Sequence, residues 1–271
     1  MKRLLEYVAG ILPIVILCAV IATIANGLID NWSHHGSQAT ASVWSAKAAT
    51  AEVALNTLVV VLSAALLSFF PALASAVLFL KWTRSTRTLT RILATALRRA
   101  MEIGAGVPRL LWGIGGAVII GGYFDLGVSA KTGVLTLSFM LAPIMFNGFV
   151  DGLKSAEDHF KPQLAALGIS PKKGFFRVQL PAARSTMLTT LSIALGRALG
   201  DAAALMLTAG LSFKLLDGLD GQASTLAMQI YHFTVNVGGG KGDAFEAAAV
   251  LLTMTAVLQI PLLFAHRYRK I

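Results

Sequence analysis

The chain has 271 residues, of which 56% are hydrophobic and only 13% are charged, and its mean hydropathy is +0.72. Soluble domains normally carry about a quarter charged residues, so this composition excludes an ordinary soluble enzyme and indicates a protein that lies mostly in a membrane. The net charge of +10 does not indicate nucleic-acid binding, because the basic residues gather near the ends of apolar segments and not on one soluble face.

Six apolar stretches follow one another along the chain, and a membrane crossing needs about 20 such residues in a helix. In chain order they fall at residues 8–28, 51–80, 104–124, 133–150, 186–211 and 245–265. The first stretch is expected to be a retained helix, because it lacks a convincing cleavage site for a signal peptide. The sequence therefore predicts an all-α polytopic membrane protein with six transmembrane helices.

The basic residues are divided unequally between the segments that connect these stretches. Seventeen of the 23 Lys and Arg residues lie at the termini and in segments 81–103 and 151–185, whereas four lie in the remaining connections. The positive-inside rule then places both termini and these two segments in the cytoplasm. The last two basic residues, Arg109 and Arg197, fall within apolar stretches.

Two of the predicted helices contain residues that disturb a helix. Pro71 offers a place to bend in the stretch 51–80, which is about 30 residues long and exceeds what a bilayer needs. The third stretch begins Gly104-Ala105-Gly106-Val107-Pro108, and Gly and Pro at this spacing predict a break or a tight helix contact. Ordinary packing of small residues is the alternative.

The cytoplasmic segment 151–185 is the candidate docking surface for an energy-supplying partner, because the chain has no Gly-rich phosphate loop of its own. We expect two short helices here, at about 153–167 and 172–179. Gly168 permits the left-handed conformation that ends a helix, and Pro171 suits the first turn of the next one. The alternative is an amphipathic linker that lies on the membrane surface.

A sequence motif runs through this segment. Gly168 is followed, after nine residues, by Val178-Gln179-Leu180-Pro181, and this spacing resembles the EAA loop of ABC importer permeases, E-A-A-x3-G-x9-I-x-L-P. Pro162-Gln163-Leu164 departs from the Glu-Ala-Ala of the family. The resemblance implies docking on an ATP-binding subunit, with Phe175 and Phe176 as apolar anchors. The implied coupling residues are Ala166, Leu167, Gly168, Phe175, Phe176, Val178, Leu180 and Pro181.

Three further runs, at residues 105–113, 196–210 and 225–231, resemble the phosphate-specific transport permeases, and the last run favours the PstA branch. The resemblance covers about residues 50–271. Departures are Asp201 in place of Glu, Ala202 in place of Thr, and Arg109 in place of a small residue. The resemblance implies a type I ABC importer permease (MetI-like) fold, with an N-terminal transmembrane helix and periplasmic loop in residues 1–50 and the permease core in residues 51–271.

The same resemblance implies a multi-pass subunit of the cell inner membrane that translocates inorganic phosphate and is not itself an enzyme. The expected partners are a second, PstC-like permease, a PstB-like dimer of ATP-binding subunits that uses ATP, a PstS-like periplasmic phosphate-binding protein, and membrane lipid, but no nucleic acid. No cofactor is expected on this chain. The alternatives are a permease for another oxyanion, such as molybdate or sulfate, an ion-coupled secondary transporter and a passive channel.

Two charged residues inside the fifth apolar stretch are the candidate substrate-pathway residues. Arg197 and Asp201 are four residues apart, so a continuous helix would place both on one face. A charge at the bilayer centre costs roughly 2.5 to 3.5 kcal/mol, which predicts that the pair faces protein or a water-filled cavity. The guanidinium suits a tetrahedral oxyanion, and Asp201 would hold it in place. An ion pair that only fixes helix packing is the alternative.

No metal centre is predicted from the sequence. The single cysteine, Cys18, has no second cysteine with which to pair or to share a metal ion. His34, His35 and His232 fall in the predicted outer loops, where solvated polar residues are expected.

Overall fold

The structure is a computed structural model that describes residues 40–267, and all regular elements in this range are helical, as predicted. The predicted membrane helix at 8–28 lies outside the described residues. In chain order the elements are α2 (Thr40–Thr83), α3 (Thr88–Gly106), α4 (Arg109–Gly115), the π-helical η1 (Gly116–Tyr123), α5 (Ala130–Ala166), α6 (Pro171–Gly174), the π-helical η2 (Phe175–Gln179), α7 (Leu180–Leu199), α8 (Ala203–Thr208), α9 (Leu226–Val235) and α10 (Lys241–Arg267).

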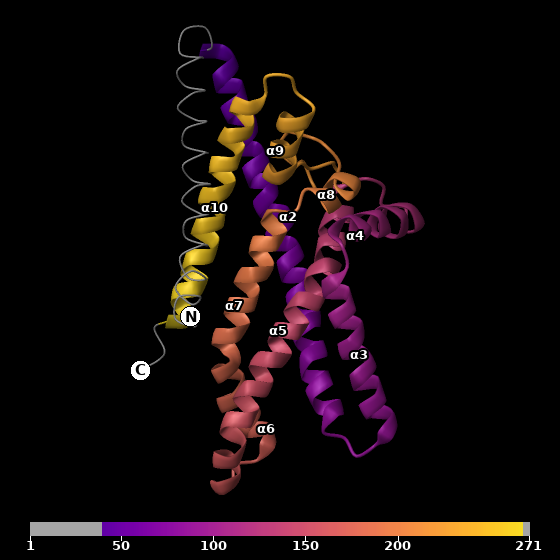
Figure 1. Cartoon of the computed structure of the whole chain (residues 1–271), viewed down its shortest axis with the longest axis vertical. Coiled ribbons are helices and arrows are strands. Elements are labelled where there is room, and N and C mark those ends of the chain that lie inside the picture. Colours follow the sequence, from indigo (N-terminus) through magenta and orange to yellow (C-terminus); the bar gives the residue numbers. More distant parts are fainter. Residues whose placement is uncertain (1–39, 268–271) are drawn as a thin grey trace, which may run out of the picture.

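The long helices α2, α5, α7 and α10 run along the long axis of the bundle (Figure 1). Helix α5 packs against both α2 and α7, and α10 packs against α7 and α9. The core is centred on α5, where Leu141, Phe146 and Phe149 are fully buried. Phe146 and Phe149 meet Phe79 and Phe69 of α2 edge to face, with ring centroids 5.8 Å and 5.2 Å apart. Aromatic packing thus joins the two longest helices.

Close contact between α5 and α7 depends on glycine. A β-carbon at Gly148 would lie 2.1 Å from Oγ1 of Thr190, and one at Gly152 would lie 3.0 Å from Cβ of Thr186. The four-residue spacing puts both glycines on one face of α5 and both threonines on one face of α7. Small residues at this spacing let helix backbones approach, which is the usual means of helix packing in a membrane.

Within the described residues, two helical segments are long and apolar enough to cross a membrane individually, Thr50–Thr83 of α2 and Ala130–Ala166 of α5. Helix α3 together with α4 and η1 forms a third candidate, which is bent by 105°. The count of six crossings therefore stays a prediction. Because α2 begins at Thr40, the domain boundary predicted at residue 50 falls inside a helix.

The break predicted at the start of the third apolar stretch is confirmed. Helix α3 ends at Gly106, Val107 is extended, and α4 starts at Arg109 directly after Pro108, which has no N–H to continue the helix. The indole Nε1 of Trp112 donates a hydrogen bond to the carbonyl oxygen of Gly104, 3.3 Å away, and this bond spans the bend. Helix α4 consequently projects sideways from the bundle (Figure 1).

Several predicted boundaries are wrong because the helices are longer than the apolar stretches that predicted them. The segment 81–103, expected to be a connection, is mostly α3, which runs back along α2 and α5. Helix α5 continues past the expected end at residue 150 to Ala166, and it absorbs the first of the two short helices expected in the cytoplasmic segment. The charged residues that suggested a boundary lie on the surfaces of these helices, where water and ion pairs satisfy them.

The fifth stretch and the segment after it also differ from the prediction. The expected helix at 186–211 is interrupted between Leu199 and Ala203, so α7 and the short α8 are separate. The expected outer loop at 212–244 contains α9, and Leu226 and Met228 in its first turn are fully buried. This segment therefore folds back into the bundle, beside α8, α10 and residues 50–57 of α2 (Figure 1).

Candidate functional site

The turn predicted between the two cytoplasmic helices is present at the far end of α5. Gly168 has a φ of +62°, and the N–H of Ile169 and the N–H of Gly168 donate to the carbonyl oxygens of Leu164 and Ala165, at 3.0 Å and 3.1 Å. This is the Schellman arrangement, which ends a helix with a left-handed residue. Pro171 then occupies the first turn of α6, as expected. Residues 164–181 thus form a hairpin, named here the coupling hairpin.

The coupling hairpin has an inner side that packs and an outer side that is open. A β-carbon at Gly174 would lie 2.8 Å from Cδ1 of the buried Leu164, so the two arms are in close contact. Phe175 is half-buried against the core, whereas Phe176 is 59% exposed and Leu167 is 72% exposed. Of the two expected apolar anchors, only Phe176 therefore lies open at the surface. Of the remaining predicted coupling residues, Val178 and Leu180 are half-buried, and Ala166, Gly168 and Pro181 are exposed.

Basic side chains surround this apolar tip. Lys172, Lys173 and Arg177 are all exposed on the short second arm. An apolar surface with a basic rim is typical of a protein-docking site, because the apolar centre supplies binding energy and the charged rim orients the partner.

Ion pairs brace the helices behind the hairpin. Glu157 of α5 forms an ion pair with Arg84, in the turn between α2 and α3. It also forms one with Lys161, whose Nζ lies 3.5 Å from the carboxylate of Glu157. Arg98 of α3 lies 3.6 Å from the carboxylate of Asp151 on α5, and its guanidinium stands over the ring of Phe79, 5.8 Å from the centroid. These contacts join α2, α3 and α5 into one unit at the end that carries the hairpin.

The predicted pairing of Arg197 with Asp201 is wrong. Helix α7 ends at Leu199, so Asp201 lies in the turn before α8 and not one helical turn above Arg197. One carboxylate oxygen of Asp201, Oδ1, accepts a hydrogen bond from the N–H of Ala204 at 3.1 Å. The other, Oδ2, lies 3.9 Å from Nε of Arg109. This bond satisfies a free N–H in the first turn of α8, and in this way it stabilises the start of α8 as a separate helix.

Asp201 therefore joins two helix interruptions. Its side chain is fully buried, whereas the side chain of Arg109 is 46% exposed. Nearby, a β-carbon at Gly113 would lie 2.7 Å from Cα of Ala204, so α4 and α8 touch backbone to backbone. Arg197 is exposed at the end of α7 and forms no ion pair with any residue in the described part of the chain.

A buried polar group that the sequence did not single out lies where α9 meets α2. The hydroxyl of Thr57 accepts from the N–H of Leu226 at 2.9 Å, and Nε2 of Gln229 donates to Oγ1 of Thr50 at 3.4 Å. The hydroxyls of Ser224 and Thr225 and Oε1 of Gln229 have no hydrogen-bond partner among the described residues. The sequence had indicated this segment only through the resemblance of residues 225–231 to a permease motif, and not through its polar side chains. No set of three or more His, Cys, Asp or Glu residues suited to a metal ion occurs within residues 40–267.

Comparison with known proteins relates this arrangement to membrane transport. The family model "Binding-protein-dependent transport system inner membrane component" matches residues 84–269. The chain is 30% identical over 166 residues to "Phosphate transport system permease protein PstA 2" of Mycobacterium bovis, covering 60% of this chain and 55% of the relative. It is 27% identical over 188 residues to a "Phosphate transport system permease protein PstA homolog" of Mycoplasma pneumoniae, covering 67% and 28%.

A solved structure shares the fold. The "Crystal structure of an amino acid ABC transporter with histidines" aligns with a TM-score of 0.63 at 16% identity, covering 86% of this chain and 99% of that chain. The predicted all-α permease fold and the resemblance drawn from the motifs are therefore both confirmed, whereas the six crossings stay a prediction. The chain spans about half the length of the first curated relative, and less of the second.

Proposed function

We propose, from the premise that the chain belongs to the family of binding-protein-dependent transport system inner membrane components, that it is the permease subunit of an ABC importer for inorganic phosphate. A member of this family is a component of membrane transport and not an enzyme. The proposal of phosphate is supported by two relatives, which are named as phosphate transport permeases of the PstA type.

The observation that carries the proposal is the coupling hairpin. It stands at the end of α5 with Leu167 and Phe176 exposed at its tip, and an exposed apolar tip with a basic rim fits a protein-docking surface. The chain contains no phosphate-binding loop of its own, so its energy must come from another subunit. We therefore assign the hairpin to docking on a separate ATP-binding subunit, which hydrolyses ATP.

The complete importer would contain further subunits. A dimer of PstB-like ATP-binding subunits, a second PstC-like permease and a PstS-like external phosphate-binding protein are the partners that this assignment requires. The translocation path would lie between the two permeases. The basic residues gather at the two termini and in the segment of the coupling hairpin. By the positive-inside rule, both termini would therefore lie in the cytoplasm, on the inner side of the cell inner membrane.

Arg197 remains the candidate for direct contact with the anion. Its guanidinium is exposed and is not neutralised by any carboxylate among the described residues, so it is free to bind a tetrahedral oxyanion through two parallel hydrogen bonds. Asp201 takes a different role from the one predicted. It caps α8 and faces Arg109, and in this way it fixes the turn that follows Arg197.

The docking assignment is tested with Gly168→Leu. A β-carbon in the left-handed region costs roughly 1 to 2 kcal/mol, although no atom lies within 4 Å of the site. The variant is expected to insert and to lose the ATP-binding subunit during purification of the complex. Gly238→Leu is the matched control, because that glycine also has open space but lies at the other end and has no positive φ. Normal co-purification with Gly168→Leu would contradict the assignment.

The substrate is tested with the reconstituted complex in vesicles. Uptake of radiolabelled phosphate is expected, with competition from unlabelled phosphate and little competition from molybdate or sulfate. Arg197→Ala is expected to abolish uptake while the complex still assembles, and Arg197→Lys is expected to restore little, because a point charge lacks the planar fork. Preferential uptake of molybdate or sulfate would show that one of these oxyanions, and not phosphate, is the substrate. The docking assignment would not be affected.

The orientation is tested by cysteine labelling in a Cys18→Ser background. A cysteine at Ser170 on the coupling hairpin is expected to be protected from an impermeant thiol reagent in intact cells. One at Gly238, at the opposite end, is expected to react, because this residue is exposed and has open space around it. The reverse pattern would invert the topology and remove the hairpin from the cytoplasm.

A further inference from the structure

Helix α3 has two unlike faces. Its inner face carries the buried Ala94 and the half-buried Leu97 and Met101, which pack toward α2 and α5. Arg98 is also engaged with the protein, through Glu102 at 2.8 Å, Asp151 and the ring of Phe79. The outer face is apolar and basic and is not covered by any described part of the chain.

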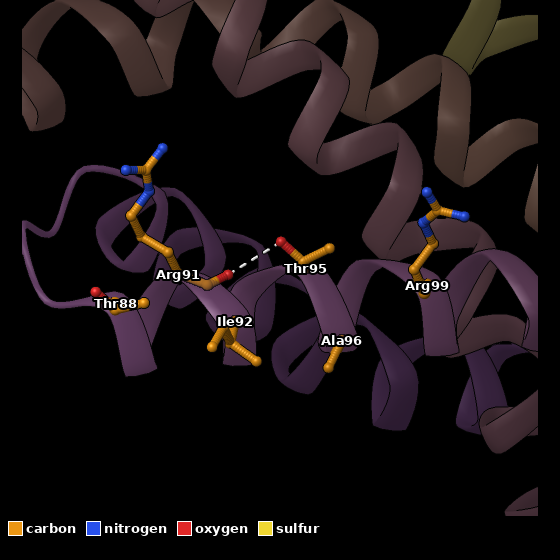
Figure 2. A pocket seen from close by; sticks show the side chains of 6 residues that line it. All are labelled: Thr88, Arg91, Ile92, Thr95, Ala96 and Arg99. Carbon is orange, nitrogen blue, oxygen red and sulfur yellow. Dashed lines mark hydrogen bonds between the residues drawn. The ribbon is translucent and has the colours of Figure 1, made fainter.

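The outer face contains a shallow groove of about 500 Å³. It is lined by Thr88, Arg91, Ile92, Thr95, Ala96 and Arg99, whose spacing of three and four residues places them on one side of the helix. Figure 2 shows the side chains of Arg91 and Arg99 extending toward one edge of this face, while Ile92 and Ala96 point toward its opposite edge. The hydroxyl of Thr95, which lies between the two arginines, donates to the carbonyl oxygen of Arg91 at 3.0 Å.

The charges of this groove are not neutralised within the described residues. Arg91 and Arg99 form no ion pair there, in contrast to Arg98 one residue away. Exposed apolar side chains flank them on the same helix: Ile92 is 59% exposed and Ile103 is 69% exposed. A site with two free guanidinium groups beside an apolar surface complements a ligand that has an anionic head and an apolar tail.

The position of the groove indicates the source of such a ligand. Arg98 contacts Phe79 and Asp151, and these residues lie where the apolar parts of α2 and α5 end. Arg99 is therefore level with the boundary of the hydrocarbon layer, and Arg91 lies about 12 Å farther along the helix, on the side of the basic segments. This interval corresponds to the headgroup region of the cytoplasmic leaflet, which contains anionic lipid.

We propose that the outer face of α3 is a binding site for an anionic phospholipid, with its headgroup phosphate between Arg91 and Arg99 and an acyl chain along Ala96 and Ile103. Thr95 lines the floor between the two guanidinium groups. The site is separate from the coupling hairpin and from the proposed anion contact at Arg197. It does not depend on which solute the importer carries.

The test uses the full chain, purified in a neutral detergent, with phosphatidylglycerol titrated in and bound lipid counted by native mass spectrometry. Wild-type chain is expected to prefer phosphatidylglycerol to phosphatidylcholine. Each arginine near an anionic lipid surface contributes roughly fivefold in affinity, so the double variant Arg91→Gln, Arg99→Gln is expected to bind phosphatidylglycerol about 25-fold more weakly. Lys241→Gln, which removes an exposed charge at the opposite end, is the control and is expected to bind normally.

Three results would overturn the proposal. One is unchanged phosphatidylglycerol binding by the double variant with its circular dichroism spectrum intact. Another is equal binding of the two lipids by wild-type chain, which would leave the groove as an unspecific apolar surface. The third is displacement of phosphatidylglycerol by millimolar inorganic phosphate, which would assign the arginines to a free anion. Both side chains are exposed, so the double variant is expected to fold.

Discussion

The two ends of the helix bundle satisfy their polar groups in opposite ways. At the end with the coupling hairpin, long helices project outward and their charges form ion pairs with partly exposed basic side chains, as the buried Glu157 does with Arg84. At the end with α8 and α9, short helices fold inward and buried side chains bind backbone groups, as Thr57 does with Leu226. The first end is thus held by contacts that tolerate water, and the second by contacts between buried side chains and the backbone.

The largest effect is expected at the inward-folded end, from Gly113→Ala. The new β-carbon would lie 2.7 Å from Cα of Ala204, and a backbone atom cannot move aside as a flexible side chain can. We expect a loss of about 1 to 3 kcal/mol in the free energy of unfolding in detergent, followed by circular dichroism. Gly115→Ala is the matched control, because no atom lies within 4 Å of its β-carbon position. Equal stability of the two variants would show that α4 does not touch α8.

The next largest loss of stability is expected from one of two buried threonines at the same end, Thr57, and not from the other, Thr225. Thr57→Val removes a hydroxyl that accepts from Leu226 and donates to the carbonyl oxygen of Val53 at 2.7 Å, and is expected to cost about 1 to 3 kcal/mol. Thr225→Val removes a hydroxyl without a partner among the described residues, and is expected to leave thermal stability unchanged or raised. A larger loss from Thr225→Val than from Thr57→Val would reverse this reading of the α9 segment.

A smaller effect is expected from Asp201, where one side chain has two roles. Asp201→Ala removes the cap of α8 and the carboxylate that faces Arg109, and is expected to cost about 1 to 2 kcal/mol. Asp201→Asn keeps a good capping group and removes only the charge. If both variants lose the same stability, the contact with Arg109 and not the cap is the dominant interaction. Unfolding of both in detergent decides between them.

The smallest effect is expected at the outward-projecting end. Glu157→Gln removes the ion pairs with Arg84, whose side chain is 45% exposed, and with Lys161, whose side chain is 68% exposed. We expect a loss of at most about 1 kcal/mol, and a smaller loss at high salt because the pair is screened. A loss that exceeded that of Gly113→Ala would contradict the difference between the two ends.

Elements whose form depends only on residues adjacent in the sequence were predictable from the sequence. The bend at Pro108 and the turn at Gly168 follow from a missing N–H and from a residue without a β-carbon, so they need no knowledge of distant contacts. The spacing from Gly168 to Pro181 likewise identified the hairpin and, by resemblance, the family. The turn itself is closed by hydrogen bonds within residues 164–169, so its form depends little on the rest of the fold.

The opposite end depended on contacts that no local pattern contains. Apolar residues run through 186–211 without a proline, so the sequence favours one helix and a pair between Arg197 and Asp201. Tertiary structure decided otherwise, because the α7–α8 turn brings Asp201 to Arg109, which is 92 positions earlier, and to the N–H of Ala204. Composition and charge thus determined a basic, helical membrane protein, and the spacing from Gly168 to Pro181 determined the hairpin for which we propose a docking role. The partners of its buried charges were decided by packing, since a carboxylate removed from water takes whichever donor the fold brings within reach.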